Sequence, residues 1–158
     1  MNSIAKINLN HLISNLNYLK SKINSSEIYP VIKSNAYGHG ATQIAKILDR
    51  NSIKTVCVAT KNEIIEILKA NTKLDIFHLG KIVLCKENMN KKVVFTINSL
   101  EDIDYINFKC RKEKIKIRCH IKVDTGMGRL GCKMEEFDEI FNLVIKSNHI
   151  KLEGVYSH

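Results

Sequence analysis

Signals for short buried strands alternate with signals for amphipathic helices along nearly the whole chain. Strand patterns fall at 28–33, 55–59, 75–80, 93–97, 115–124 and 152–158. Helical patterns of apolar residues precede and separate them, at 9–23, 41–48, 60–68, 103–110 and 137–145. Thr60 with Glu63 predicts a capping box at the start of the third helix, and Ser99 with Asp102 a cap-like pair before the fourth. This alternation predicts βαβ units that build a parallel sheet. An open doubly wound sheet and an eight-stranded barrel are both built in this way.

The strand expected at 115–124 distinguishes the two architectures. Its residues alternate between an apolar and a polar set, namely Ile115, Ile117, Cys119, Ile121 and Val123 against Lys116, Arg118, His120, Lys122 and Asp124. A central strand of an open parallel sheet is usually apolar on both faces. A barrel strand can turn polar groups inward near the mouth, where catalytic residues gather. We therefore predict an α/β fold of the TIM-type (β/α)8 barrel, incomplete because about six of the eight strands are present.

Composition argues against several classes of partner. The net charge of +9 is typical of nucleic-acid-binding proteins, but the lysines are scattered over expected helix surfaces without interleaved aromatic residues, so we expect no nucleic-acid partner. No apolar run reaches the ~18 residues of a membrane span, and residues 1–12 lack the apolar core of a signal peptide. We expect a cytoplasmic protein. Five cysteines without a CxxC pair indicate free thiols.

A glycine pattern and a set of histidines each suggest a ligand site, but the sequence around them favours a structural role. The sequence GMGRLG at 126–131 matches the G-x-G-x-x-G pattern of dinucleotide-binding loops. In that fold the third glycine lies in the following helix, whereas the helical pattern here begins only near Phe137, so a tight strand-to-helix turn is favoured. His78, His120 and His158 fall near strand ends, but no H-x-H pair or suitably placed acid accompanies them, and we expect no metal site.

Lys33 ends the apolar run of the first expected strand and enters a glycine-containing loop, in YPVIKSNAYGHG at 29–40. Partial burial favours the neutral amine of a lysine, and a neutral amine forms Schiff bases with aldehydes. Gly38 and Gly40 would let the N-terminus of the next helix approach an anion such as a phosphate, and Tyr37 adds a hydroxyl. A surface lysine after a strand is the alternative interpretation.

Two stretches, VIKSNAYGHG at 31–40 and HIKVDTGMGRLG at 120–131, closely resemble the signature sequences of alanine racemases. LEGVYSH at 152–158 is similar to a further barrel strand of that family, and the order and spacing of elements match along the whole chain. The resemblance implies a barrel followed by a β-rich domain, with pyridoxal 5'-phosphate as the cofactor. Ser34 stands where the family usually has alanine, and strand parity would turn it away from Lys33.

The resemblance also implies a role for each matching residue. Lys33 would carry pyridoxal phosphate as a Schiff base and, once freed by substrate, act as acid and base on one face of the α-carbon of alanine. Tyr37 would help to hold the phosphate, and His158 would belong to the network around the pyridine ring. Arg129 would orient the substrate carboxylate. Lys122, which is carbamylated in some relatives, would support that arginine.

Racemisation requires an electron sink at the α-carbon and two proton-handling groups. In this family the second base is a tyrosine from the β domain of the partner subunit of a homodimer, and later barrel strands supply further cofactor ligands. We therefore expect residues 1–158 to be an N-terminal pyridoxal-phosphate-binding barrel domain, truncated, without the C-terminal β domain, and inactive by itself. The full-length family makes D-alanine for peptidoglycan.

Three other functions share this barrel. A non-enzymatic pyridoxal-phosphate homeostasis protein would need neither the DTGMGRLG loop nor the tyrosine after Lys33. An amino-acid decarboxylase of the same fold would carry a lysine motif different from KSNAYGHG. A racemase of another amino acid, such as serine, stays open because substrate choice depends largely on the domain that follows the barrel.

Overall fold

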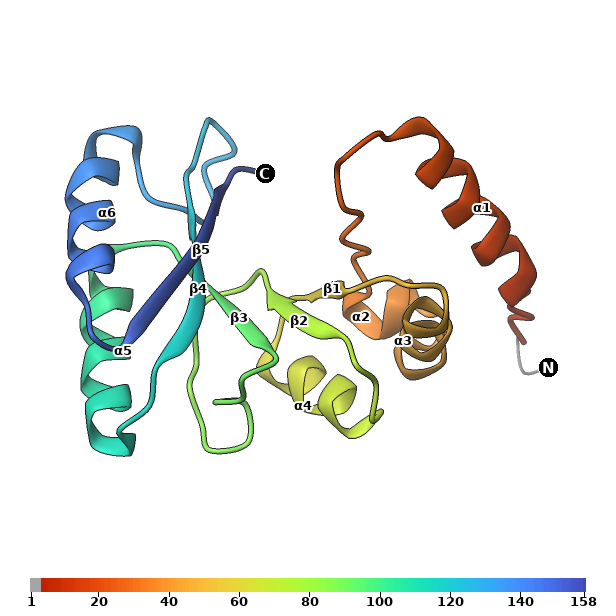
Figure 1. Cartoon of the computed structure of the whole chain (residues 1–158), viewed down its shortest axis with the longest axis horizontal. Helices are drawn as coiled ribbons and strands as arrows, with labels where there is room; N and C mark the ends of the chain where they lie inside the picture. The colour runs from red at the N-terminus through yellow and green to blue at the C-terminus, as the bar shows by residue number, and fades with distance from the viewer. Residues whose placement is uncertain (1–3) are drawn as a thin grey trace.

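The computed structural model describes residues 4–158, which form six α-helices, a short 3-10 helix and five strands (Figure 1). Residues 1–3 lie outside the described residues. They belong to the stretch at 1–12 in which no signal peptide is expected. The elements in chain order are α1 (Leu9–Lys22), α2 (Lys33–Tyr37), α3 (Ala41–Arg50), β1 (Thr55–Val58), α4 (Lys61–Lys69), β2 (Asp75–His78), β3 (Val93–Ile97), α5 (Leu100–Glu113), β4 (Ile117–Lys122), η1 (Met134–Glu136), α6 (Phe137–Lys146) and β5 (Ile150–Tyr156).

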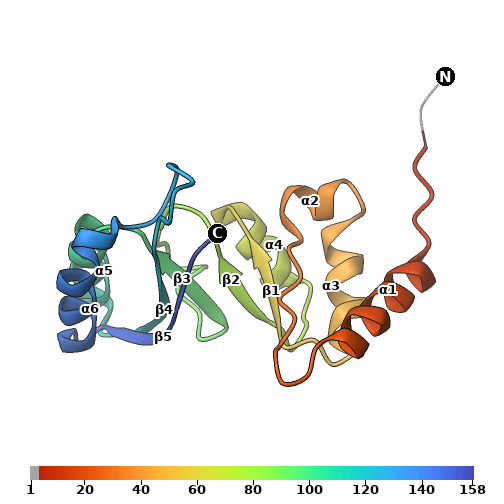
Figure 2. The same ribbon diagram turned by 90° about the horizontal axis from the view of Figure 1, so that it is seen from above.

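The five strands form one parallel sheet in the order β1-β2-β3-β4-β5. Each strand lies beside the next one in the chain, so crossovers of one hand keep the connecting helices on one side of the sheet. A doubly wound sheet would instead reverse its order at a switch point. Figures 1 and 2 show α5 and α6 beside β4 and β5, with α3 and α1 at the other end of the sheet. This wall of sequential strands confirms the predicted TIM-type barrel in an incomplete form.

The strand expected at 28–33 is reduced to a single bridge. Val31 pairs in parallel with Cys57, and the N–H of Cys57 donates to the carbonyl oxygen of Pro30 at 2.8 Å. Pro30 has no N–H with which to extend the ladder, and the backbone leaves the extended conformation directly after the bridge. The six expected strands are therefore five strands and one bridge beside β1, and Lys33 begins α2 instead of ending a strand.

Polar side chains at the starts of the helices agree in part with the predicted caps. The capping box of Thr60 and Glu63 opens α4 as predicted. Ser99 occupies the N-cap position of α5 but makes no capping hydrogen bond through its side chain. Asp102 instead accepts a hydrogen bond from the backbone N–H of Asn98 at 2.8 Å. Of the cap-like pair expected at Ser99 and Asp102, only the carboxylate of Asp102 therefore binds a backbone N–H at the start of α5.

The main core lies between the sheet and its helices, and the opposite face of the sheet is the wall of the barrel interior. A small buried cluster of Cys57, Phe77 and Val94 occupies this inner face, with Leu79 and Tyr156 packed against it. No helix within residues 4–158 is long and apolar enough to cross a membrane.

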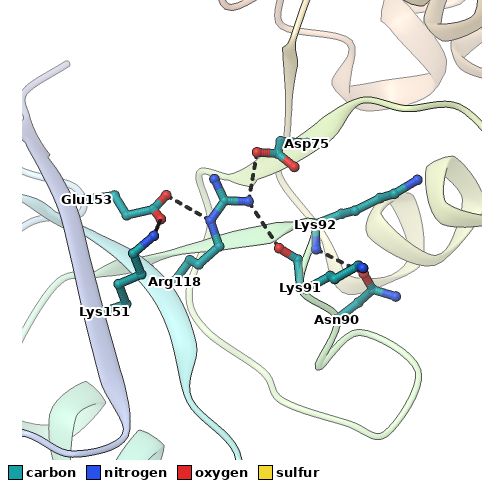
Figure 3. Close-up of polar contacts among 7 residues, drawn as sticks. All are labelled: Asp75, Asn90, Lys91, Lys92, Arg118, Lys151 and Glu153. Carbon is teal, nitrogen blue, oxygen red and sulfur yellow. Dashed lines mark hydrogen bonds and ion pairs between the residues drawn. The ribbon is translucent and has the colours of Figure 1, made fainter.

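A charged network lies on the same inner face, near the amino ends of β2 and β4 (Figure 3). Arg118 Nη1 lies 2.7 Å from Asp75 Oδ2, and Arg118 Nε donates to Glu153 Oε2 at 2.8 Å. Lys151 Nζ lies 2.7 Å from the other oxygen of Glu153. The guanidinium also donates to the carbonyl oxygen of Lys91 at 3.0 Å. One arginine thus joins β2, β4 and β5 at the end of the interior away from the barrel mouth.

Candidate active site

Lys33 directly precedes a left-handed turn that begins at Ser34. The φ angles of Ser34, Asn35 and Ala36 are 53°, 54° and 52°, and that of Tyr37 is 54°. Each L-residue in this conformation costs roughly 1–2 kcal/mol, so the run needs support from the surrounding structure. Strand parity does not apply here, and the expectation that it turns Ser34 away from Lys33 is wrong, because Ser34 is in the turn.

Hydrogen bonds close this turn and join it to the next helix. The N–H of Ala36 donates to the carbonyl oxygen of Ile32 at 2.9 Å. Asn35 Oδ1 accepts the N–H of Ala41, the first residue of α3, at 2.8 Å. The turn after Lys33 is therefore fixed to the N-terminal end of α3.

The carboxylate of Glu63 fastens the same turn to α4. Its Oε1 accepts the N–H of Ser34 at 2.7 Å, and its Oε2 accepts the N–H groups of Ala59 at 2.8 Å and Thr60 at 3.0 Å. Partial burial by itself raises the pKa of Glu63, but the backbone donors outweigh this effect and the pKa is lowered. Sequence reasoning found the cap and missed the bond to Ser34, which spans 29 residues and leaves no local pattern.

The surroundings of Lys33 fit an aldehyde that carries a phosphate. Lys33 Nζ lies 6.0 Å from the centre of the Tyr37 ring. Gly38 and Gly40 have positive φ angles of 86° and 92°, and open space lies where a side chain would begin. α3 begins at Ala41, next to these glycines, and the N–H of Ala41 is already bound by Asn35 Oδ1. An amine and a phenol thus lie near one another beside open space, which suits an aldehyde that carries a phosphate.

Lys122 is the last residue of β4 and is only 3% exposed. Burial, followed by the charge of Arg129, lowers the pKa of Lys122, while Asp124 acts in the opposite sense. Lys122 Nζ lies 6.0 Å from the centre of the Tyr156 ring. Arg129 itself is exposed on the loop after β4. The structure therefore brings Lys122 and Arg129 close enough for their charges to interact.

Asp124 organises the loop that carries Arg129. Its Oδ1 accepts the N–H groups of Gly126 at 3.0 Å and Gly128 at 3.1 Å, and these two bonds lower the pKa of the carboxyl. Gly131 has a φ of 122°, and a side chain there would begin 2.7 Å from the backbone nitrogen of Asp124. The loop thus closes onto the end of β4, and α6 begins only at Phe137. This is the strand-to-helix turn favoured from the sequence, without the helical third glycine of a dinucleotide site.

The three histidines near strand ends have separate surroundings. His78 is buried, and its Nε2 lies 3.0 Å from the carbonyl oxygen of Ala59. The ring of His120 covers Gly154, where a side chain would begin 3.0 Å from the ring. His158 is exposed, two residues beyond β5. Within residues 4–158, no group of three or more His, Cys, Asp or Glu residues could hold a metal ion.

The predicted site residues fall into two groups at the carboxyl edge of the sheet. Lys33 and Tyr37 lie on α2, beside β1, while Lys122 and Arg129 lie at and after the end of β4, with His158 after β5. Figure 2 shows α2 and the loop after β4 projecting beyond the same edge of the sheet. Barrel enzymes carry their active sites at this edge. The catalytic and binding roles of these residues stay predictions.

The fold and the site define an incomplete α/β barrel domain with a lysine-centred candidate active site at its mouth. The profile of the family "Alanine racemase, N-terminal domain" matches residues 7–158. The chain belongs to this family.

Individual members of the family show how much of the full-length protein the chain represents. It is 35% identical to the alanine racemase of Clostridium kluyveri over 97% of this chain and 40% of that protein. The alanine racemase of Clostridium difficile 630 in complex with cycloserine matches it with a TM-score of 0.89 and 35% identity, over 96% of this chain and 43% of that one. An alanine racemase from Bartonella henselae with covalently bound pyridoxal phosphate has a TM-score of 0.83 and 25% identity, over 96% of this chain and 45% of that one. The chain thus spans less than half the length of these relatives.

Proposed function

We propose that this chain is the N-terminal, cofactor-binding barrel domain of an alanine racemase, which interconverts L-alanine and D-alanine with pyridoxal 5'-phosphate. The observation that carries the proposal is the placement of Lys33 directly before a left-handed turn that lies beside the N-terminal end of α3. Membership of the family supports the reaction, and the Bartonella henselae relative supports the cofactor. We further propose that the full-length enzyme is a cytoplasmic homodimer that supplies D-alanine for peptidoglycan.

The residues around α2 would hold the cofactor. Lys33 would hold its aldehyde carbon covalently, while the hydroxyl of Tyr37 and the N-terminal end of α3 would bind its phosphate. His158 would lie in the network around the pyridine ring. When bound, pyridoxal phosphate withdraws electrons from the α-carbon of an amino acid and so makes its α-hydrogen acidic.

The chain's own side chains would then orient the substrate and move one proton. Once the amine of alanine has replaced Lys33 on the aldehyde carbon, the freed Lys33 Nζ would remove or return the α-proton on one face of the α-carbon. Arg129, on the loop fixed by Asp124, would bind the carboxylate of alanine. Lys122 would position that guanidinium. As an ammonium it repels Arg129, whereas a carbamylated Lys122 would carry a negative charge and attract it.

We assign only one of the two proton-handling groups to residues 1–158. By resemblance, the second is a tyrosine of the β domain of the partner subunit. A chain that carries Lys33 without that tyrosine should exchange the α-hydrogen of one alanine enantiomer and leave its configuration unchanged, because the proton returns to the face from which it left.

Hydrogen exchange tests this proposal. The 158-residue chain is incubated with pyridoxal phosphate and each alanine enantiomer in deuterated buffer, beside a Lys33→Ala variant whose folding is checked by circular dichroism. We expect faster exchange of one enantiomer with the wild-type chain and no inversion. Equal exchange with both proteins would contradict the role of Lys33, and net racemisation would contradict the one-base assignment. Serine, run in parallel, tests the alternative substrate.

A further inference from the structure

We propose that Glu63 is a positioning residue for Lys33, which it orients through the peptide group that joins Lys33 to Ser34. The inference rests on the proposed function of Lys33. Glu63 Oε1 accepts the N–H of Ser34 at 2.7 Å. The bond joins the first residue of the turn after Lys33 to the first turn of α4, which is far away in the sequence.

The position of this bond makes it act on Lys33. A peptide group is planar, so the carbonyl of Lys33 and the N–H of Ser34 move as one unit. Fixing that N–H fixes the rotation between the Cα and carbonyl carbon of Lys33. On the other side, the bridge beside β1 ends directly before Lys33, where the N–H of Ile32 donates to the carbonyl oxygen of Cys57 at 2.8 Å. The backbone of Lys33 is thus held from both sides.

Glu63 also connects the backbone of Lys33 to the sheet. Its second oxygen accepts the N–H groups of Ala59 and Thr60 at 2.8 and 3.0 Å, and these residues directly follow β1. A half-buried carboxylate with three backbone donors remains ionised and has little freedom to move. It therefore ties the start of the left-handed turn to the carboxyl end of the neighbouring strand.

The competing interpretation is that Glu63 is only a helix cap. The capping box needs Thr60 and the Oε2 side of Glu63, and the bond to Ser34 is additional to it. Two substitutions separate the roles. Glu63→Asp keeps a negative charge in the first turn of α4, but its side chain is one methylene shorter, which removes the bond to Ser34 and also weakens the cap. Thr60→Ala weakens the cap and leaves Glu63 Oε1 in reach of Ser34.

The experiment compares the wild-type chain, Glu63→Asp and Thr60→Ala in two measurements. The first is the amide hydrogen exchange of Ser34 by NMR, without cofactor. The second is the share of pyridoxal phosphate found on Lys33, relative to all other lysines, after borohydride reduction and peptide mapping. In Glu63→Asp we expect Ser34 to exchange about tenfold faster, the effect of losing one charge-assisted hydrogen bond, and the share on Lys33 to fall severalfold. Thr60→Ala should stay near the wild type in both measurements.

Each result decides between the interpretations. Wild-type exchange and wild-type labelling in Glu63→Asp would overturn the inference, as would equal losses in Thr60→Ala and Glu63→Asp. If the wild-type chain itself does not concentrate the label on Lys33, the proposed function fails, and the inference fails with it. Glu63→Gln keeps the length and does not depend on the folding of Glu63→Asp, but its single amide oxygen cannot serve both Ser34 and the N–H groups of Ala59 and Thr60. In this variant the share of label on Lys33 should fall in step with any acceleration of Ser34 exchange, and accelerated exchange with wild-type labelling would contradict the inference.

Discussion

The hydroxyl groups of Thr96 and Tyr156 lie 2.8 Å apart on the inner face of the sheet. The contact joins β3 to β5 across β4, which lies between them. Thr96 Oγ1 also donates to the carbonyl oxygen of His78, on β2, at 2.7 Å. With that proton committed, the Tyr156 hydroxyl donates to Thr96. One buried hydroxyl therefore links three strands close to the carboxyl edge of the barrel wall.

Replacing Thr96 with valine should weaken this wall. Thr96→Val keeps the shape of the side chain but leaves the hydroxyl of Tyr156 without its partner, and we expect a loss of about 1–2 kcal/mol in the free energy of unfolding. Burial raises the pKa of Tyr156 to about 12, so its hydroxyl stays protonated and needs an acceptor at pH 7. Urea unfolding measures the loss. Tyr156→Phe completes a double-mutant cycle, and strictly additive losses would show that the hydroxyls are not coupled.

Removing Arg118 should destabilise the chain in a pH-dependent way. Arg118→Ala leaves Asp75 and Glu153 without their shared cation, and we expect a loss of about 2 kcal/mol at pH 7, allowing for partial exposure to solvent. Burial raises the pKa of Glu153, but Lys151 and Arg118 outweigh it and the pKa is lowered. A lowered carboxyl pKa stabilises the fold above about pH 4.3, and this contribution is lost as the pH falls through the folded-state pKa.

The measurement is urea unfolding of the wild type and Arg118→Ala between pH 7 and pH 3. The difference between the two proteins should be largest near pH 7 and should shrink below about pH 4.3. Arg111→Ala, at an exposed position on α5, is the matched control and should change stability by less than about 0.5 kcal/mol. A difference for Arg118→Ala that stays constant over this pH range would contradict the ion-pair explanation.

Removing the charge of Lys122 should stabilise the folded chain. Because its pKa is lowered in the folded state, the unfolded chain binds the proton more tightly, and protonation works against folding at pH 7. Lys122→Met should therefore raise the free energy of unfolding at pH 7 by up to about 1 kcal/mol, and the gain should vanish above about pH 10.4. Lys116→Met, at an exposed position, controls for the added methionine. A clear loss of stability in Lys122→Met at pH 7 is the result that this explanation excludes.

The sequence predicted most of the fold because its helices and strands have strong local signals. The apolar periodicity located α3, α4 and α6, and the alternation over 115–124 identified the inward polar face on which Arg118 and Lys122 lie. The prediction of a first strand at 28–33 was wrong because Pro30 removes a ladder donor and because the turn that begins at Ser34 is left-handed. Only Asn35 and the closing Gly38 are residue types that favour this conformation. Ser34, Ala36 and Tyr37 do not, so tertiary contacts are needed to hold the turn.

The candidate site was predicted where its chemistry lies within one motif, and missed where it depends on contacts between segments. Lys33 and Tyr37 share a short stretch, so their proximity follows from spacing alone. The bonds from Asp124 to Gly126 and Gly128 were also within reach of sequence reasoning, because an aspartate before a glycine turn commonly accepts such N–H groups. Glu63 acts on Ser34 through space, and only the structure brings the two together.

The central claim, that Lys33 is the residue that holds pyridoxal phosphate, is tested most directly by locating the covalent bond. The wild-type chain and Lys33→Ala are mixed with pyridoxal phosphate, reduced with borohydride, digested and mapped by mass spectrometry. We predict that most of the label lies on the peptide that contains Lys33 and that Lys33→Ala shows only weak labelling spread over surface lysines. A wild-type label distributed evenly among the lysines, or concentrated on a different one, would contradict the account.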